Sequence, residues 1–362
     1  MSIQERSYLD LAVRAAIQAP SADNTQPLRY KWDGQYLSIF YDARRVAGRT
    51  FGPDHPATLL SVGCVAENLK QLMSNLNFEF QYEINEITGT SGDEPYFRCV
   101  IPVGFLEDGS QTGIQSIPLF NRHTNRLPYS REPLDLKHIL TGIVTEEGGA
   151  GVRLFDTQSG RKQVADLIQQ ASEVRFQTPE VHEWLANSLR FTSQDVASGD
   201  GLDIATLDLP PGGRSFMRLI SSWPRMATLN KLFGMYRLLA LIEARPIRLS
   251  PAIIGIVGPS DARGAFNAGL LLARLWIHLN KKGFAVQPYF VVSDQLIRRE
   301  EGLIPPLLMR QTNLIQEKVV SLFKVPENQQ LYMILRIGLP KKQPVRSKRL
   351  PISCLFERAN EK

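Results

Sequence analysis

The sequence predicts an α+β protein in which one plan of helix, strand and strand occurs twice. Apolar residues recur with helical spacing over residues 58–75, and two strand-like runs follow at 78–84 and 96–103. The same order returns over residues 265–337, where an insertion at 294–328 separates the two strands. We therefore expect an antiparallel or mixed central sheet flanked by helices, with two related halves packed as an internal pseudo-dimer.

Each half also begins with elements of its own. Residues 7–18 place leucines and alanines on one helical face, and Pro20 ends that helix. Residues 36–41 alternate in polarity, which is typical of a half-buried strand. The corresponding elements of the second half are helices at 134–144 and 161–175, a short strand at 152–155 and a buried helix at 265–282 that Gly283 caps.

The predicted halves cover residues 1–115 and 116–362. The second half contains an unusual segment, Asp200 to Arg248, which opens on glycines and prolines and continues as an apolar, Met-rich and Arg-rich helical pattern. Its part at about 210–247 is interpreted as an extra packed helical pair or as a lid over a site. A helix lying on a membrane surface is a third interpretation, because basic amphipathic stretches do this.

The charge balance favours a small anionic partner over a nucleic acid. The chain has 362 residues and a formal net charge of +6. Its basic residues are scattered, apart from Lys341-Lys342 and a cluster at 346–349. A phosphate suits this distribution better than a nucleic-acid surface does. We expect a small-molecule substrate and no nucleic-acid partner.

Cysteine usage and the apolar runs argue against several other classes. The cysteines Cys64, Cys99 and Cys354 are odd in number and widely spaced, so neither a disulfide framework nor a structural zinc site is expected. The histidines are isolated, so no metal is predicted. The first ten residues contain acids and no apolar core, and no apolar run reaches the roughly eighteen residues of a membrane span. We expect a cytoplasmic protein.

The loop at residues 19–27 reads Ala-Pro-Ser-Ala-Asp-Asn-Thr-Gln-Pro and is the first candidate site. Its two prolines fix the backbone, while its hydroxyls and its two amides, Asn24 and Gln26, donate and accept hydrogen bonds. The pyrimidine edge of a flavin ring, with its carbonyls and ring nitrogens, needs such partners. An Asx-rich turn that caps the next element is the alternative.

The second candidate is Asn-Arg-His-Thr-Asn-Arg-Leu-Pro-Tyr at residues 121–129. Arg122 and Arg126 bracket the hydroxyl of Thr124. Arginine offers forked, charge-assisted donors and threonine adds a neutral one, so the three could grip one phosphate. A basic surface loop is the alternative.

These two motifs resemble those of the nitroreductase family of flavoproteins. The first loop is similar to the family motif APSxxNxQPW, and the second to R[RH]SxRxF with Thr124 in place of serine. The motif order also resembles the two-halved, Acg-type subgroup of putative NAD(P)H nitroreductases. The resemblance implies a nitroreductase-like fold and bound FMN. It implies that Pro20, Ser21, Asn24 and Gln26 line the flavin, and that Arg122, Thr124 and Arg126 hold its phosphate and ribityl chain.

Four further positions follow from the same resemblance. A basic residue near the C-terminus of family members returns to the flavin phosphate, which implies that role for Arg349. Asp23 stands where the subgroup usually has histidine and Leu28 where the family usually has an aromatic residue, so both are expected in the substrate pocket. Gly201 is expected there too, because the Gly-Asp-Gly-Leu stretch at 199–202 resembles one that precedes the lid region; an ordinary turn is its alternative.

The resemblance implies hydride transfer from NADH or NADPH through FMN to a small acceptor, nitroaromatic or quinone-like. No catalytic residue is predicted, since the flavin performs the chemistry. Two alternatives stay open: an FMN-binding or storage protein with a lid-covered flavin, and an FMN-dependent dehydrogenase or oxidase in a biosynthetic pathway. We expect either a monomeric pseudo-dimer or a homodimer.

Overall fold

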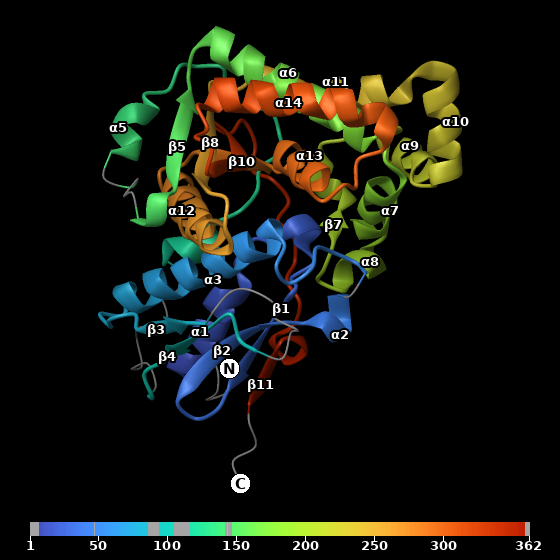
Figure 1. The fold of residues 1–362 in the computed structure, drawn as a ribbon. Coiled ribbons are helices and arrows are strands. Elements are labelled where there is room, and N and C mark those ends of the chain that lie inside the picture. Colours follow the sequence, from blue (N-terminus) through green and yellow to red (C-terminus); the bar gives the residue numbers. More distant parts are fainter. Residues whose placement is uncertain are drawn as a thin grey trace.

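The computed structural model describes residues 7–46, 48–85, 94–104, 116–141, 143 and 147–358. Its strands form two main sheets on opposite sides of a pair of long helices, α3 (Pro56–Asn75) and α12 (Ala262–Lys281) (Figure 1). The predicted α+β class is confirmed. The expected antiparallel and mixed strand pairing flanked by helices is confirmed too, and each helix-strand-strand unit builds a sheet of its own.

The first sheet has the order β11-β1-β2-β4-β3. Its neighbours are antiparallel, except that β11 joins β1 in parallel. The predicted strand at 78–84 is shorter than expected, and residues 86–93 after it lie outside the described residues. The elements of this part are α1 (Tyr8–Ile17), β1 (Leu28–Trp32), β2 (Tyr36–Tyr41), α2 (Ala43–Val46), β3 (Tyr82–Ile84), β4 (Phe97–Val100) and β11 (Phe356–Arg358).

The second sheet, β5-β8-β10-β9, is antiparallel throughout and repeats the neighbour relations of β1-β2-β4-β3. The predicted helix-strand-strand units are therefore present as α3-β3-β4 and α12-β9-β10. Residues 105–115, beside the predicted boundary between the halves, lie outside the described residues. The strands of this sheet are β5 (Gly151–Phe155), β8 (Ala252–Pro259), β9 (Ala285–Tyr289) and β10 (Gln329–Gly338).

Two glycines set how closely α3 and α12 approach. Both helices have 20 residues, and Gly63 and Gly269 each occupy the eighth position. A Cβ atom on Gly63 would lie 2.1 Å from the Phe266 carbonyl oxygen, and one on Gly269 would lie 2.3 Å from that of Leu60. Any larger side chain would therefore push the helices apart at the centre of the molecule.

The second half differs from the first by two helical insertions. One, between β9 and β10, contains α13 and α14, and α13 begins at Val291 directly after β9. The other lies between β5 and β8. The helix expected at 134–144 is reduced to α5 (Leu136–Leu140). The remaining bounds are α6 (Gln158–Arg175), α7 (Pro179–Ser188), β6 (Leu189–Arg190), α8 (Ser193–Ala197), β7 (Leu202–Asp203), α13 (Val291–Glu300) and α14 (Pro306–Phe323).

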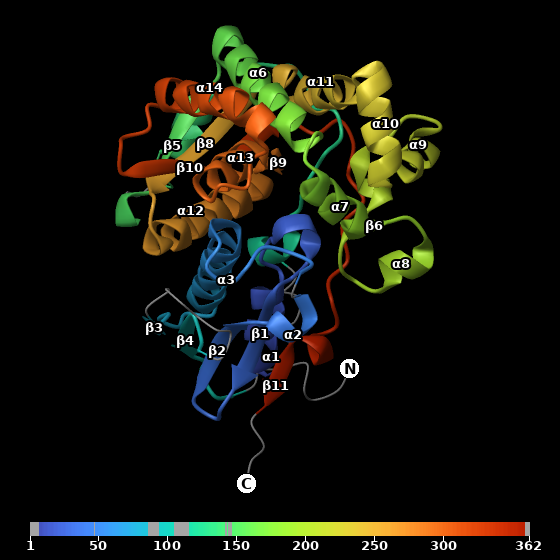
Figure 2. The same ribbon diagram turned by 45° about the vertical axis from the view of Figure 1, so that its right-hand side comes forward.

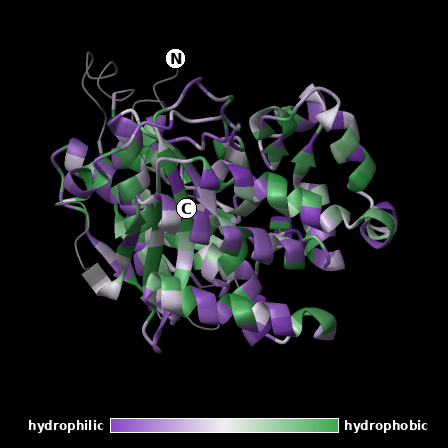
Figure 3. Cartoon of the chain, turned by 90° about the horizontal axis from the view of Figure 1, so that it is seen from above, coloured by the Kyte–Doolittle hydropathy of each residue, from purple (hydrophilic) through white to green (hydrophobic). Residues whose placement is uncertain are grey.

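The segment expected as a lid at about 210–247 forms three helices, α9 (Gly213–Ile220), α10 (Trp223–Phe233) and α11 (Met235–Arg248). Pro224 lies in the first turn of α10, and Gly234, with φ 61°, separates α10 from α11. These helices lie at an outer corner, far from the first sheet (Figure 2). From above, the helices of the molecule alternate hydrophobic and hydrophilic residues along their length (Figure 3), as amphipathic helices do.

The C-terminal segment ties the two sheets together. After β10 the chain leaves the second sheet and returns to the first, where β11 pairs with β1 (Figure 1). The Tyr30 amide donates to the Leu355 carbonyl at 2.8 Å, and Leu355 is 2% exposed. This crossing brings the basic cluster at 346–349 to the loop at 19–27.

Candidate functional site

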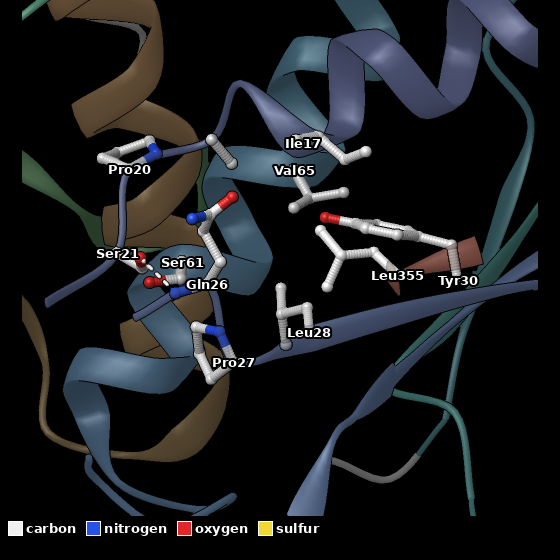
Figure 4. Close-up of a pocket in the computed structure, with 11 residues that line it drawn as sticks. Ile17, Pro20, Ser21, Gln26, Pro27, Leu28, Tyr30, Ser61, Val65 and Leu355 are labelled. Carbon is white, nitrogen blue, oxygen red and sulfur yellow. Dashed lines mark hydrogen bonds between the residues drawn. The ribbon is translucent and has the colours of Figure 1, made fainter. Parts of the chain in front are cut away.

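The loop at 19–27 has an unusual backbone. Asp23, Asn24 and Gln26 have φ angles of 47°, 57° and 52°. These lie in the left-handed region, which residues other than glycine adopt only rarely. The Gln26 amide donates to Ser21 Oγ at 2.9 Å, which closes the loop (Figure 4). Because such a cluster costs folding energy, it indicates a site at which the surroundings impose the conformation.

The amides of Asn24 and Gln26 join three distant segments. Asn24 Nδ2 donates to the carbonyls of Gly201 and Lys348, both at 3.1 Å, and its Oδ1 accepts from Arg349. Gln26 donates to the Gly199 carbonyl at 2.9 Å and accepts from the Leu350 amide at 3.0 Å. Three of the four segments singled out in the sequence therefore meet here. The two amides already have protein partners on both ends, so they position the segments around them.

The close approach of these segments requires the glycines at positions 199 and 201. Their φ angles are 85° and 70°. A Cβ on Gly199 would lie 2.5 Å from the Arg349 carbonyl oxygen, and one on Gly201 would lie 2.6 Å from that of Ser188. The Gly201 amide also donates to the Asn24 carbonyl at 3.2 Å. The segment lying on the loop is thus 199–203, and not the predicted lid at 210–247.

Arg122, which is buried, and Arg349, which is partly buried, form a cationic pair. Both guanidinium groups donate to the Gln18 carbonyl, at 2.7 and 3.2 Å. Arg122 is 7% exposed and stacks over the Trp276 ring at 4.6 Å. Burial, and then the charge of Arg349, lower the pKa of Arg122 to about 9. Burial likewise lowers the pKa of Arg349 to about 10.

This pair fits an anionic ligand such as a phosphate. Arg122 Nε is buried and has no hydrogen-bond partner in the described part of the chain. Across those same residues no carboxylate pairs with Arg122 or Arg349, and Arg346 adds a third positive charge nearby. Buried cations are normally paired. An uncompensated pair beside a strained loop is what a bound phosphate would satisfy.

Arg126 belongs to a different group from Arg122. It donates to Thr206 Oγ1 at 3.3 Å and lies near Asp23, Tyr129 and Tyr289. Burial raises the pKa of Asp23, although Arg175, Arg126 and a hydrogen bond from Ser188 oppose this. Asp23 and Arg126 therefore meet across the two halves, while Arg122 and Arg349 meet at Gln18.

Thr124 and Leu28 differ in their surroundings. Thr124 is partly exposed in the loop that follows Arg122. Leu28 is 4% exposed at the start of β1 and, with Pro20, lines a cavity of about 10 Å³ (Figure 4). A space of this size holds a single water molecule, and the place of Leu28 in a substrate pocket stays a prediction.

A larger cavity of about 400 Å³ lies next to the candidate site and was missed from the sequence. Phe51 stacks on His55 at 4.1 Å and meets the Trp184 ring edge-on at 5.6 Å. Arg298, only 6% exposed, also lines it. The link to the loop is Thr25, whose hydroxyl donates to Thr50 Oγ1 at 3.2 Å. In the sequence, only the spacing of the aromatic residues around Phe51 could have suggested such a cavity, and that spacing is a weak signal.

His55 supplies a neutral donor to this cavity. Its Nδ1 accepts from the Ala57 amide at 3.1 Å and so caps α3. Burial, with help from the charge of Arg298, lowers the pKa of His55 to about 4. The ring is therefore neutral near pH 7, and because Nδ1 accepts, Nε2 carries the proton.

Among the described residues no cluster of histidine, cysteine, aspartate or glutamate could hold a metal ion. No described helix is long and apolar enough to cross a membrane. Cys64 and Cys99 are free and buried, as expected for core thiols.

Comparison with known proteins gives distant likenesses. No family model matches the chain. An uncharacterized protein of Mycobacterium tuberculosis is 25% identical over 297 residues, which is 77% of this chain and 38% of that protein. The chain thus spans well under half the length of that relative.

The chain is also similar to several solved structures. The FMN-dependent nitroreductase NfnB from Mycobacterium smegmatis, in complex with NADPH, is 14% identical over 70% of this chain and 100% of its own, with a TM-score of 0.38. Oxidized iodotyrosine deiodinase bound to FMN and 3-iodo-L-tyrosine is 13% identical over 65% of this chain and 92% of its own, with a TM-score of 0.35. A nitroreductase-like family protein from Bacillus cereus is 12% identical over 72% of this chain and 100% of its own, with a TM-score of 0.36. Likenesses this distant establish neither a shared cofactor nor a shared reaction.

Proposed function

We propose that this chain binds FMN and works as an NAD(P)H-dependent oxidoreductase of the nitroreductase type. The observation that carries the proposal is the cationic pair of buried Arg122 and partly buried Arg349, which has no carboxylate partner among the described residues and lies against the strained loop at 19–27. Both sequence motifs and the basic tail contribute to this one place.

Each residue has a part in holding the cofactor. Arg122 and Arg349 bind the phosphate, and the partly exposed hydroxyl of Thr124 adds a neutral donor beside them. Arg126, in its separate group with Asp23, is proposed as a further positive group for the cofactor. When bound, FMN supplies the hydride chemistry. Ser21, Asn24 and Gln26 hold the loop in shape, and their direct contact with the flavin remains a prediction.

The acceptor is proposed to enter the cavity lined by Phe51 and Trp184. Its volume falls within the range of roughly 300–1,000 Å³ that is typical of small-molecule sites. Aromatic walls suit a planar nitroaromatic or quinone-like molecule, and His55 Nε2–H with Arg298 would donate to its oxygens. Asp23 lies near Ser188, which influences its pKa and whose hydroxyl donates to the carbonyl of Trp184, a residue of the cavity wall, at 3.0 Å.

A storage protein is the second candidate, and one observation favours it. The segment at 199–203 is fixed on the loop by Asn24, Gln26 and the Gly201 amide. A cofactor beneath so firmly held a cover would exchange slowly. Anaerobic NADH or NADPH distinguishes the two: it bleaches the flavin band of an oxidoreductase and leaves that of a storage protein unchanged.

The purified protein is expected to be yellow and to release FMN on denaturation.

Replacing Arg122 or Arg349 by alanine removes charge-assisted hydrogen bonds, so FMN affinity should fall by roughly 10- to 100-fold for each. Fluorescence titration with FMN measures this. Arg310→Ala, an exposed arginine on α14, is the matched control and should bind as the parent does. Unchanged FMN retention in both alanine variants would refute the phosphate assignment.

A further inference from the structure

Helices α9 to α11 present a surface that is both basic and apolar. Residues 213–249 contain seven of the fifteen large apolar side chains that are exposed in the described chain. Among these are Leu232, Phe233, Leu238, Leu241 and Ile242. The same 37 residues carry seven arginine and lysine side chains, all exposed. We call these exposed residues the basic-apolar face.

Helical spacing gathers these residues on the outer side of each helix. In α11, residues 237, 238, 241, 242, 245 and 248 are exposed, while Ala240, Ala244 and Ile247 pack inward. In α10, the exposed positions are 224, 225, 228, 231, 232 and 233. Cations and apolar residues thus share one side of each helix.

The turn between α10 and α11 carries the most exposed apolar group of this face. Leu232 and Phe233 are 65% and 73% exposed. Gly234, in the left-handed conformation, turns the chain immediately after them. This leucine and phenylalanine at the tip of the helical hairpin lie mostly outside the packed interior of the described chain, and the hairpin lies at an outer corner of the molecule (Figure 2).

Acidic residues are nearly absent from this surface. Glu243 is the single acid in residues 213–249, and it is partly buried in an ion pair with Arg175 at 2.5 Å. Of the seven cations, Arg248 pairs with Asp166 on α6. The stretch has a formal charge of +6, from seven cations and one acid, which equals the net charge of the whole chain.

The combination of cations and exposed apolar side chains distinguishes between a second copy, a nucleic acid and a lipid bilayer as the partner of this face. A second copy docked through a two-fold axis would place the same cations against each other, which is unfavourable. A nucleic acid would neutralise the cations but would leave Leu238, Leu241 and Ile242 against phosphates. An anionic lipid bilayer offers negative headgroups to the cations and an acyl boundary to the leucines and Phe233.

We propose that the basic-apolar face docks this protein on the surface of an anionic lipid bilayer, with Leu232 and Phe233 entering the interface. The attachment is peripheral, in keeping with the absence of a membrane-crossing helix among the described residues. It does not depend on the flavin site.

Co-sedimentation of the full-length protein with vesicles tests this. Phosphatidylcholine vesicles are compared with vesicles that also contain phosphatidylserine, at low and high salt. The parent should bind the anionic vesicles more tightly, and salt should weaken the binding by screening. Arg237→Gln with Arg245→Gln should lower the affinity by about 30-fold, at about 1 kcal/mol for each charge. Leu232→Ser with Phe233→Ser should lower it at least about tenfold.

The matched control is Leu307→Ser with Arg310→Gln on α14, where Leu307 is 95% exposed. It should bind vesicles as the parent does. Equal binding to neutral and anionic vesicles, or an equal loss in the control, would overturn the proposal. So would mass photometry showing a dimer that Leu232→Ser with Phe233→Ser dissociates, or tight binding of duplex DNA in place of vesicles; these results would identify a second copy or a nucleic acid as the occupant.

Discussion

Asp294 is a buried carboxylate close to the candidate site. It is 6% exposed at the start of α13 and accepts a hydrogen bond from Gln295 at 2.7 Å. Burial raises its pKa from 3.8 to about 6, and the charge of Asp23 adds to the rise, while Arg298 and Arg175 oppose it. The folded protein therefore holds a proton at Asp294 at a pH where the unfolded chain has lost it.

This difference in bound protons determines the direction in which stability changes with pH. Between about pH 4 and about pH 6 the folded state binds more protons, so the free energy of unfolding should fall as pH rises through that window and level off above it. The contribution of Asp294 to this fall is up to about 3 kcal/mol. In Asp294→Asn the fall should be smaller, as urea unfolding at several pH values will show. Asp208→Asn, on the surface, serves as the control, and an unchanged profile in Asp294→Asn would contradict this prediction.

Among single residues, those with a chemical signature could be read from the sequence. The amides Asn24 and Gln26 and the arginines at 122, 126 and 349 were singled out, and the structure brings each into one of two neighbouring groups. Whether they contact a cofactor stays a prediction. Asp294 and the aromatic cavity at Phe51 could not be read, because burial and ring contacts arise only from chain packing.

At the scale of elements, the crossing of α3 and α12 is the most sensitive feature. Gly63→Ala should destabilise the protein by roughly 1–3 kcal/mol, because the new methyl group would strike the Phe266 carbonyl. Thermal or urea unfolding measures the loss. Gly52→Ala is the control, since a Cβ there meets nothing within 4 Å. A neutral Gly63→Ala would mean that the helices can separate at little cost.

Periodic elements were predictable, including the short strands at 36–41 and 152–155, and a uniformly apolar one was not. The helices at 58–75 and 265–282 were found within a few residues of their ends. Strand β8 was missed, because its continuous apolar run lacks the alternation that marks a half-buried strand. The segment at about 210–247, for which a packed helical pair was one interpretation, forms three helices, and Gly234 in its left-handed conformation separates α10 from α11.

At the scale of the molecule, one core and one returning tail join the halves. The main apolar cluster includes Leu37 and Ile39 of the first sheet together with Ile254 and Leu335 of the second. The tail adds β11 to the first sheet after leaving the second. The predicted pseudo-dimer and its possible further pairing remain predictions, but halves that share a core should not fold independently.

Truncation tests the role of the tail. Ending the chain after Gln343 removes Arg349, buried Leu355 and β11, so stability should fall by about 3 kcal/mol or more and FMN should be lost. Calorimetry and the flavin absorbance of the purified protein report the two effects. Deleting only residues 359–362 is the control. A truncated protein that keeps its melting temperature and its FMN would show that the tail is dispensable.

The sequence by itself determined the α+β class, the repeated helix-strand-strand order and the residues able to grip a phosphate, because periodicity and donor chemistry are local properties. Tertiary structure alone decided that there are two sheets, that Arg122 pairs with Arg349 while Arg126 faces Asp23, and that 199–203 covers the loop. These depend on contacts between residues more than a hundred positions apart, and no local pattern encodes which distant partners will meet.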